Sequence, residues 1–177
     1  MNDAKNFPTV TIRPVNPADE PAVHAVIAAA FGQETEAGLV HDLRHCGALV
    51  LERVAETPDR RIVGHIAFSR VTGAGAGHRL HVSCLASLSV HPDFQRLGIG
   101  SQLVESSLAD LRKAGEDLVL VLGPPAYYPR FGFDPVLAQK VHGPYAGNAF
   151  MAMALTEAGD NDLPVEVTFA TPFEDFE

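Results

Sequence analysis

Basic residues are scarce in this chain of 177 residues, which has 13 Lys and Arg against 22 Asp and Glu and a formal net charge of −9. Nucleic acids and anionic membranes select basic patches on the proteins that bind them. The charge balance therefore argues against either as the main partner. An acidic surface would suit a cationic substrate such as an amine, although excess negative charge also serves ordinary solubility.

Cysteine is nearly absent as well. Cys46 and Cys84 are far apart and form no Cys-x-x-Cys pair, so we expect no metal site and interpret both as small buried residues. His41 and His45 are four residues apart and could share a helix face. No carboxylate accompanies them in a metal-ligand pattern, and we expect both to face solvent.

Long apolar runs are also lacking. No run approaches the ~20 residues that a membrane span requires, and the start of the chain, residues 1–5, lacks the apolar core of a secretory signal. These absences predict a soluble, cytoplasmic protein. With 46% hydrophobic residues, the chain is long enough for one buried core and short for two, so we expect one domain spanning residues 1–177.

The spacing of apolar residues predicts alternating strands and helices. We expect strands over residues 9–14, 48–55, 61–71, 80–90, 118–122, 148–155 and 164–168, and helices from about Pro17 to Gly32, over 35–45 and over 98–114. The Ala- and Gly-rich segment 72–77 predicts a mobile surface loop. This order indicates an α/β fold whose central sheet is mixed, mostly antiparallel and covered by helices on both faces.

One stretch, residues 88–111, joins an apolar strand to a helix through a turn that contains Gly98 and Gly100. The first N–H groups of a helix have no intrahelical partner and carry partial positive charge, so this turn predicts an anion site. A nucleoside triphosphate loop would have Lys-Ser or Lys-Thr after the second glycine. A dinucleotide loop would have a third glycine where Leu103 stands, so the sequence excludes both readings.

The remaining pattern, Gln95-x-x-Gly98-x-Gly100 after Leu-Ser-Val-His-Pro, resembles the pyrophosphate-binding signature of the GNAT superfamily of N-acetyltransferases. A second signature follows as Ala-Tyr-Tyr-Pro-Arg-Phe-Gly-Phe, residues 126–133, in which Tyr128 stands four residues before Gly132, as is common in that superfamily. The resemblance covers residues 9–133 and is typical of a branch of small bacterial N-acetyltransferases. It implies the GNAT fold and acetyl-CoA as co-substrate.

The resemblance also implies where acetyl-CoA binds. The strand around 86–90 and the strand 118–122 are expected to splay apart around the pantetheine arm, with backbone contacts along Leu88, Ser89 and Val90. The diphosphate is expected at the loop formed by Gln95, Arg96, Leu97, Gly98, Ile99, Gly100 and Ser101. Arg96 has the alternative role of a solvated charge, and Ser101 that of an ordinary first-turn residue.

For the chemistry, the resemblance implies that Tyr128 is the catalytic acid. A tyrosine with an ordinary pKa of ~10 is protonated at neutral pH and can protonate the departing thiolate. Packing is the alternative role for Tyr128, and packing is the role expected of Tyr127. The asparagine that often follows the fifth strand of this fold is replaced by Pro124 and Pro125, which leaves the local backbone there undetermined.

A general base is harder to find. Several GNAT enzymes have an acidic residue on the strand equivalent to 80–90, but this strand has none. His81, Ser87 acting through water, and a substrate deprotonated by a desolvating pocket remain as alternatives.

The resemblance implies direct transfer of an acetyl group from acetyl-CoA to the primary amine of a small molecule, with a homodimer as a further expectation. Two other functions stay open. The missing carboxylate favours a non-catalytic acyl-CoA-binding regulatory module. A long open groove would instead favour acetylation of a protein N-terminus or lysine.

Overall fold

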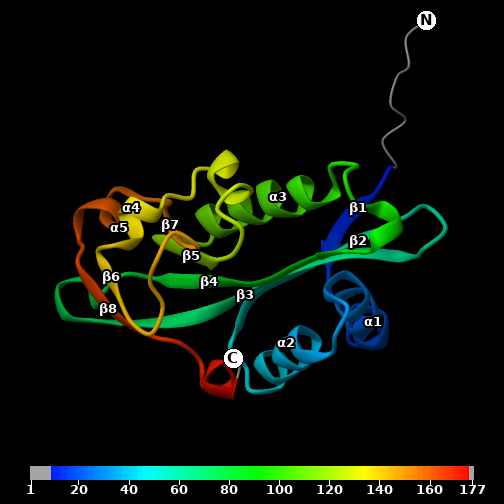
Figure 1. Cartoon of the computed structure of the whole chain (residues 1–177), viewed down its shortest axis with the longest axis horizontal. Helices are drawn as coiled ribbons and strands as arrows, with labels where there is room; N and C mark the ends of the chain where they lie inside the picture. The colour runs from blue at the N-terminus through cyan, green and yellow to red at the C-terminus, as the bar shows by residue number, and fades with distance from the viewer. Residues whose placement is uncertain (1–8, 176–177) are drawn as a thin grey trace, which may run out of the picture.

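The computed structural model describes residues 9–175 and contains an eight-stranded sheet with helices on both of its faces (Figure 1). The strands are β1 (Thr11–Pro14), β2 (Leu49–Glu56), β3 (Ile62–Ala74), β4 (Val82–Val90), β5 (Leu118–Leu122), β6 (Val141–His142), β7 (Phe150–Ala154) and β8 (Val165–Thr168). The helices are α1 (Glu20–Phe31), α2 (Thr35–His45), α3 (Ile99–Lys113), α4 (Pro135–Ala138) and α5 (Glu157–Asn161).

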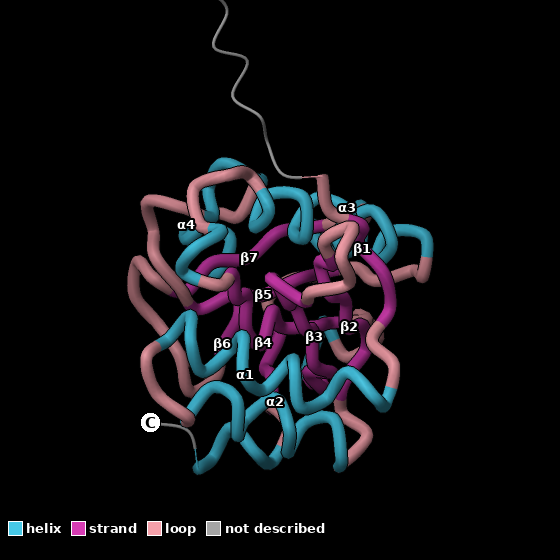
Figure 2. Tube along the Cα trace, turned by 90° about the vertical axis from the view of Figure 1, so that its right-hand side faces the viewer, coloured by secondary structure: helices cyan, strands magenta, loops and turns pink. Residues whose placement is uncertain are grey.

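The strands follow the order β1-β2-β3-β4-β5-β7, and β8 pairs with both β3 and β6. All pairings are antiparallel except β4 with β5 and β6 with β8. Helix α3 connects the parallel strands β4 and β5 and covers one face of the sheet, while α1 and α2 cover the other (Figures 1 and 2). The mixed, mostly antiparallel sheet between helices that the sequence predicts is confirmed.

The sheet opens in the middle of β4. Strand β5 pairs with β4 only from Val82 to Leu85, and β4 then continues to Val90 without a partner on that side. On its other side β4 remains paired with β3, and Ala86 falls at an irregularity in that register. The last five residues of β4 therefore present one unpaired backbone edge.

Helix α3 is held against the sheet by an apolar stripe. Its buried residues Leu103, Val104, Leu108 and Leu111 pack in one cluster with Ile66, Phe68, Val119 and Val121 of the strands. Burying one such aliphatic side chain contributes about 1.5–3 kcal/mol. This packing fixes the N-terminus of α3 close to the unpaired end of β4.

The segment 72–77 differs from the expected mobile loop. Strand β3 continues through Ala74, and Thr72, Gly73 and Ala74 pair with β8. Residues 75–77 follow as a short 3-10 turn, and Gly73 and Gly77 have no side chain where β8 approaches closely. A Cβ atom at Gly77 would lie 2.7 Å from Cβ of Val165.

The structure also decides the environment of the cysteines and histidines. Cys84 is buried as expected, but Cys46 is exposed just after α2, so the expectation of a buried residue there is wrong. His41 and His45 are exposed, as expected. Among residues 9–175, no helix is long and apolar enough to cross a membrane.

Candidate functional site

The turn before α3 has the geometry of an anion site. Gly98 adopts a left-handed conformation with φ of 84°, and Arg96 does so at 64°. The first helical hydrogen bond runs from the N–H of Gln102 to the carbonyl of Gly98 over 3.1 Å. The N–H groups of the three residues before Gln102 therefore precede the hydrogen-bond ladder and can bind an anion.

A groove of about 570 Å³ passes over this turn. It is lined by Leu88, Val90, Phe94, Gln95, Arg96, Gly98, Ile99, Gly100, Ser101, Tyr127 and Arg130. The structure thus brings eight of the ten predicted binding residues to one groove, and Ser89 and Leu97 are absent from its lining.

The unpaired edge of β4 forms one side of this groove. The N–H of His91 donates to the carbonyl of Val63 on β3 over 2.8 Å, and the amide of Gln95 donates to the carbonyl of Val90 over 3.0 Å. Because backbone groups alternate in direction along a strand, Leu88 and Val90 direct theirs to the unpaired side. Ser89 directs its backbone toward β3, where His65 is its partner.

Tyr128 lies where β4 and β5 part, in a short 3-10 helix, η4 (Tyr128–Phe131). Its ring is 6% exposed and packs edge-to-face against Tyr127 and Phe133. A Cβ atom at Gly123 would lie 2.5 Å from the ring, so the glycine makes room for the tyrosine. Burial raises the pKa of Tyr128 well above its ordinary value, and the hydroxyl is protonated at neutral pH.

Tyr127 has a larger part in the site than the packing role expected from sequence. It lines the groove, burial raises its pKa while the neighbouring Ser101 opposes that rise, and the guanidinium of Arg130 lies 4.5 Å from the centre of its ring. A Cβ atom at Gly100 would lie 2.9 Å from the Tyr127 hydroxyl oxygen. No spacing rule separates two adjacent tyrosines, so only the fold identifies this contact.

A second cleft of about 610 Å³ begins at Tyr127 and Tyr128 and continues between β4, α2 and the C-terminal segment. Its lining is largely apolar and includes the aromatic residues Phe31, Tyr145, Phe150, Phe169 and Phe173. Glu36 of α2 is the one charged residue among those that line it. Ser87 lines this cleft, whereas His81 does not.

A domain model described as an acetyltransferase (GNAT) domain matches residues 11–136. The chain belongs to the GNAT family of acetyltransferases. The N-acetyltransferase YhbS of Escherichia coli K12 is 33% identical over 93% of this chain and 99% of its own length. A second N-acetyltransferase of that organism, YjhQ, is 34% identical over 70% of this chain and 68% of its own length.

Solved GNAT structures agree with this assignment. The crystal structure of YhbS from Escherichia coli in complex with CoA has a TM-score of 0.87 and 32% identity, covering 96% of this chain and 94% of that one. A GNAT acetyltransferase from Brucella melitensis in complex with acetyl-CoA has a TM-score of 0.77 and 33% identity, covering 93% and 98%. These similarities confirm the GNAT fold that was expected from the sequence.

A buried charge network on the α1 and α2 face of this GNAT sheet is not apparent from the sequence. His65 on β3 is fully buried, and its Nε2 lies 2.8 Å from a carboxylate oxygen of Glu52 on β2. Glu52 also pairs with the guanidinium of Arg44 on α2. Burial alone would raise the pKa of Glu52, but the hydrogen bonds from His65 and Arg44 outweigh it and lower the pKa to about 2.

Another set of polar side chains meets at the surface. The structure brings Glu20 of α1 to His41 and His45, with the three ligand atoms within 4.8 Å of one another. The sequence-based statement that no carboxylate accompanies these histidines is wrong, because α1 supplies one from 21 residues upstream of His41. Arg44 lies 3.9 Å from the same carboxylate, and this cation opposes the binding of a metal cation there.

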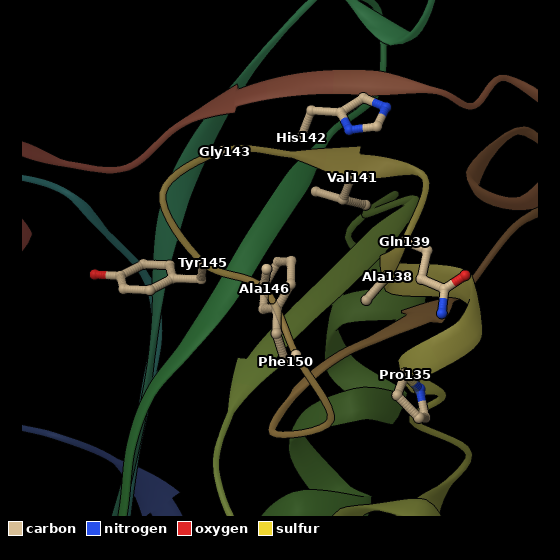
Figure 3. Close-up of a pocket in the computed structure, with 10 residues that line it drawn as sticks. Pro135, Ala138, Gln139, Val141, His142, Gly143, Tyr145, Ala146 and Phe150 are labelled. Carbon is tan, nitrogen blue, oxygen red and sulfur yellow. The ribbon is translucent and has the colours of Figure 1, made fainter.

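A smaller hollow of about 340 Å³ lies between α4, β6 and the loop that follows β6 (Figure 3). Pro135, Ala138 and Gln139 come from the helix side, and Tyr145 and Phe150 are shared with the large cleft. Its lining contains no carboxylate or guanidinium group. This hollow lies apart from the anion-binding turn, with which it shares no residue.

The Glu52 network predicts how stability depends on pH. The pKa of Glu52 falls from an unfolded value of 4.5 to about 2 in the folded protein. Its contribution to stability is therefore complete above pH 4.5 and is lost as the pH falls toward about 2. We expect Glu52→Gln to lower the free energy of unfolding by about 1–3 kcal/mol at pH 7, because His65 and Arg44 lose their anionic partner.

Urea denaturation of both proteins between pH 7 and pH 2 measures this effect. The difference between wild type and variant is expected to shrink below pH 4.5, where Glu52 takes up its proton in the unfolded chain but stays ionised in the folded protein. A difference that stays constant over this range would contradict the assigned network.

Proposed function

We propose that this GNAT protein transfers the acetyl group of acetyl-CoA directly to the primary amine of a small molecule. The observation that carries the proposal is the continuity of the two clefts along β4. An anion-binding turn lies at one end, an unpaired strand edge in the middle and the protonated Tyr128 at the other end. The diphosphate, pantetheine and thioester of acetyl-CoA require those features in that order.

The anion-binding turn supports the proposal through its backbone. The N–H groups of Ile99, Gly100 and Ser101 face the diphosphate, and Arg96 and Arg130 line the same groove as cations. The amide groups of Leu88 and Val90 pair with the pantetheine amides as an added strand would. Similar GNAT structures that contain CoA or acetyl-CoA favour this assignment.

Tyr128 acts as the acid in this proposal. Attack of the amine on the thioester carbonyl expels a thiolate, which needs a proton to leave. The buried phenol keeps its proton at neutral pH and lies where β4 and β5 part. A cytoplasmic location and a homodimer, both expected from the sequence, stay predictions.

The chemistry of the second cleft points to the acceptor. Its aromatic lining favours an amine with an apolar substituent, and Glu36 is placed to attract the ammonium group. The carboxylate of Glu36 is held by the side-chain amide of Gln33 over 2.9 Å. Phe173, from the 3-10 helix η5 (Thr171–Asp175), also lines the cleft. A cleft lined by α2, β4 and η5 favours a small acceptor over an extended polypeptide.

The anion-binding turn can be tested with two glycines of equal geometry. Gly98 and Gly115 both have φ of 84° and open space around a hypothetical Cβ atom, but Gly115 lies beyond the far end of α3. Replacing either with alanine is expected to destabilise the protein by about 1–2 kcal/mol, because alanine disfavours this conformation. Only Gly98→Ala is expected to weaken CoA binding, by about tenfold, which equals ~1.4 kcal/mol.

Isothermal titration with CoA and urea denaturation of both variants separate the two effects. Equal loss of CoA affinity in Gly98→Ala and Gly115→Ala would contradict the assigned turn. Absence of CoA binding to the folded wild type would overturn the proposed function.

Tyr128 can be tested against its neighbour. We expect Tyr128→Phe to lower kcat by about 100-fold with little change in CoA affinity, since general acids contribute about 10²–10⁴-fold. Tyr127→Phe, which removes the hydroxyl beside the anion-binding turn, is expected to weaken CoA binding and to retain most of kcat. Release of free thiol from acetyl-CoA in the presence of an amine panel measures both. Tight CoA binding with no turnover for any amine would instead support the non-catalytic binding module.

Substitution of Glu36 tests whether the acceptor binds as a cation. We expect Glu36→Gln to raise KM for alkylamines about fivefold, the loss of roughly 1 kcal/mol of ion pairing at a partly exposed site, and to leave KM for acetyl-CoA unchanged. Glu34→Gln is the matched control, because Glu34 lies two residues before Glu36, at the start of α2, and does not line the cleft. Equal effects of both substitutions would mean that surface charge alone, and not Glu36, attracts the amine.

A further inference from the structure

Six buried side-chain polar groups have no hydrogen-bond partner among the described residues, and three of them lie on one face of the sheet near the unpaired end of β4, with Ser69 farther along β3 on the same face. The three are Nδ1 of His65 and the hydroxyl oxygens of Ser87 and Ser89. A buried polar atom without a partner costs about 1–3 kcal/mol, so such groups are rare unless they serve water or a ligand. Their positions relative to one another indicate what they serve.

The strand register places the three groups along a bent path, first along β4 and then across to β3. Ser89 and His65 are direct partners across β4 and β3, where facing Cβ atoms lie about 4.5–5.5 Å apart. Ser87 is two residues before Ser89 and therefore lies on the same face, about 6–7 Å along the strand. None of the three groups hydrogen-bonds directly to another, and side chains at these spacings leave room for one bridging water between neighbours.

This path lies beneath α1 and α2. His65 pairs across the sheet with Val54, which packs in the cluster formed by Val23, Ile27 and Val40 of these helices. At one end of the path, Ser87 lines the second cleft, which we call the acceptor cleft because the proposed acceptor amine binds there. At the other end His65 contacts Glu52, whose side chain is 12% exposed. The path thus connects the acceptor cleft with a carboxylate near the surface.

The hydrogen bond to Glu52 sets the tautomer of His65. Glu52 is ionised, so it can only accept, and Nε2 of His65 must carry the donated proton. Burial lowers the pKa of His65, so the ring is neutral at neutral pH and Nδ1 is a bare acceptor. The charged groups that act on the ring are Glu52 on β2 and Arg44 on α2. The arrangement resembles a base oriented by a carboxylate.

The proposed reaction requires such a base. An alkylammonium has a pKa close to the ~10.4 of lysine, so at pH 7 its nitrogen bears three protons. The amide product retains one of them. A second proton replaces the one that Tyr128 gives to the thiolate, while the C–N bond forms and the C–S bond breaks. The third proton must leave the nitrogen before attack, and β4 has no carboxylate to accept it.

We propose that His65, acting through the hydroxyls of Ser89 and Ser87 and bridging water, receives the proton that an ammonium acceptor loses before attack. Nδ1 takes up the proton, and the resulting imidazolium is stabilised by the carboxylate of Glu52. The proton returns to bulk water when the product leaves the cleft. His65 is a positioning residue in this scheme, because it does not touch the acceptor itself. The proposal rests on the proposed acetyl transfer to an amine.

Paired acceptors test the proposal. An arylamine is neutral at pH 7, so it has no third proton to lose, whereas an alkylamine has one. We expect His65→Gln and Ser89→Ala to lower kcat with alkylamines by about 100-fold and to leave kcat with arylamines unchanged. Raising the pH to about 10.4, where half of an alkylamine is already neutral, is expected to restore most of the lost activity.

Ser107→Ala is the matched control, because Ser107 is also buried without a hydroxyl partner but lies on α3, on the opposite face of the sheet. It is expected to retain kcat with both acceptors. CoA titration verifies that each variant is folded, and Ser89→Ala decides the question if His65→Gln does not fold.

The outcomes separate this proposal from the one on which it rests. Wild type that acetylates amines, with variants that lose activity equally for both acceptors or lose none, overturns the route through His65 and leaves the acetyl transfer standing. Wild type that binds CoA but acetylates no amine overturns both.

Discussion

The parting of β4 from β5 after Leu85 and Val121 is the constraint on which the site depends. A strand inside a sheet normally satisfies its backbone groups on both edges. Here β4 gives up this pairing for its last five residues while β3 continues to hold the other edge. The cost of unpaired amides is offset when a ligand supplies the missing partners. The same opening gives Tyr128 a place between the strands, so binding and chemistry share one structural origin.

Close packing on both sides of this opening fixes its position. Helix α3 is fixed by its apolar stripe, and its N-terminus therefore lies at the end of β4 without depending on a mobile loop. Gly98 allows the left-handed turn that directs the first N–H groups outward. On the other side, Gly123 accommodates the ring of Tyr128, and Phe133 contacts that ring edge-to-face. Small residues at close contacts thus position both functional groups.

The face of the sheet under α1 and α2 is built differently from the face under α3. The α3 face is packed with apolar side chains, whereas the opposite face, although also apolar over much of its area, contains His65, Ser87 and Ser89 together in buried positions. An apolar layer of similar volume would be at least as stable. These polar groups begin at the acceptor cleft and end at Glu52. This position is the reason for proposing that they move a proton away from the acceptor.

Local patterns in the sequence determined much of this protein. The run 118–122 predicts β5 residue for residue, and the apolar spacing after Gly98 predicts α3 to within one residue at each end, because both signals depend only on near neighbours. The glycine turn and the Tyr-Tyr segment likewise indicated the family. Tertiary structure alone decided that residues 72–74 continue β3, that Tyr127 lies over the anion-binding turn, and that Glu52 meets both His65 and Arg44. Each of these depends on the register between distant strands or on the approach of a helix, and no short window of sequence contains that information.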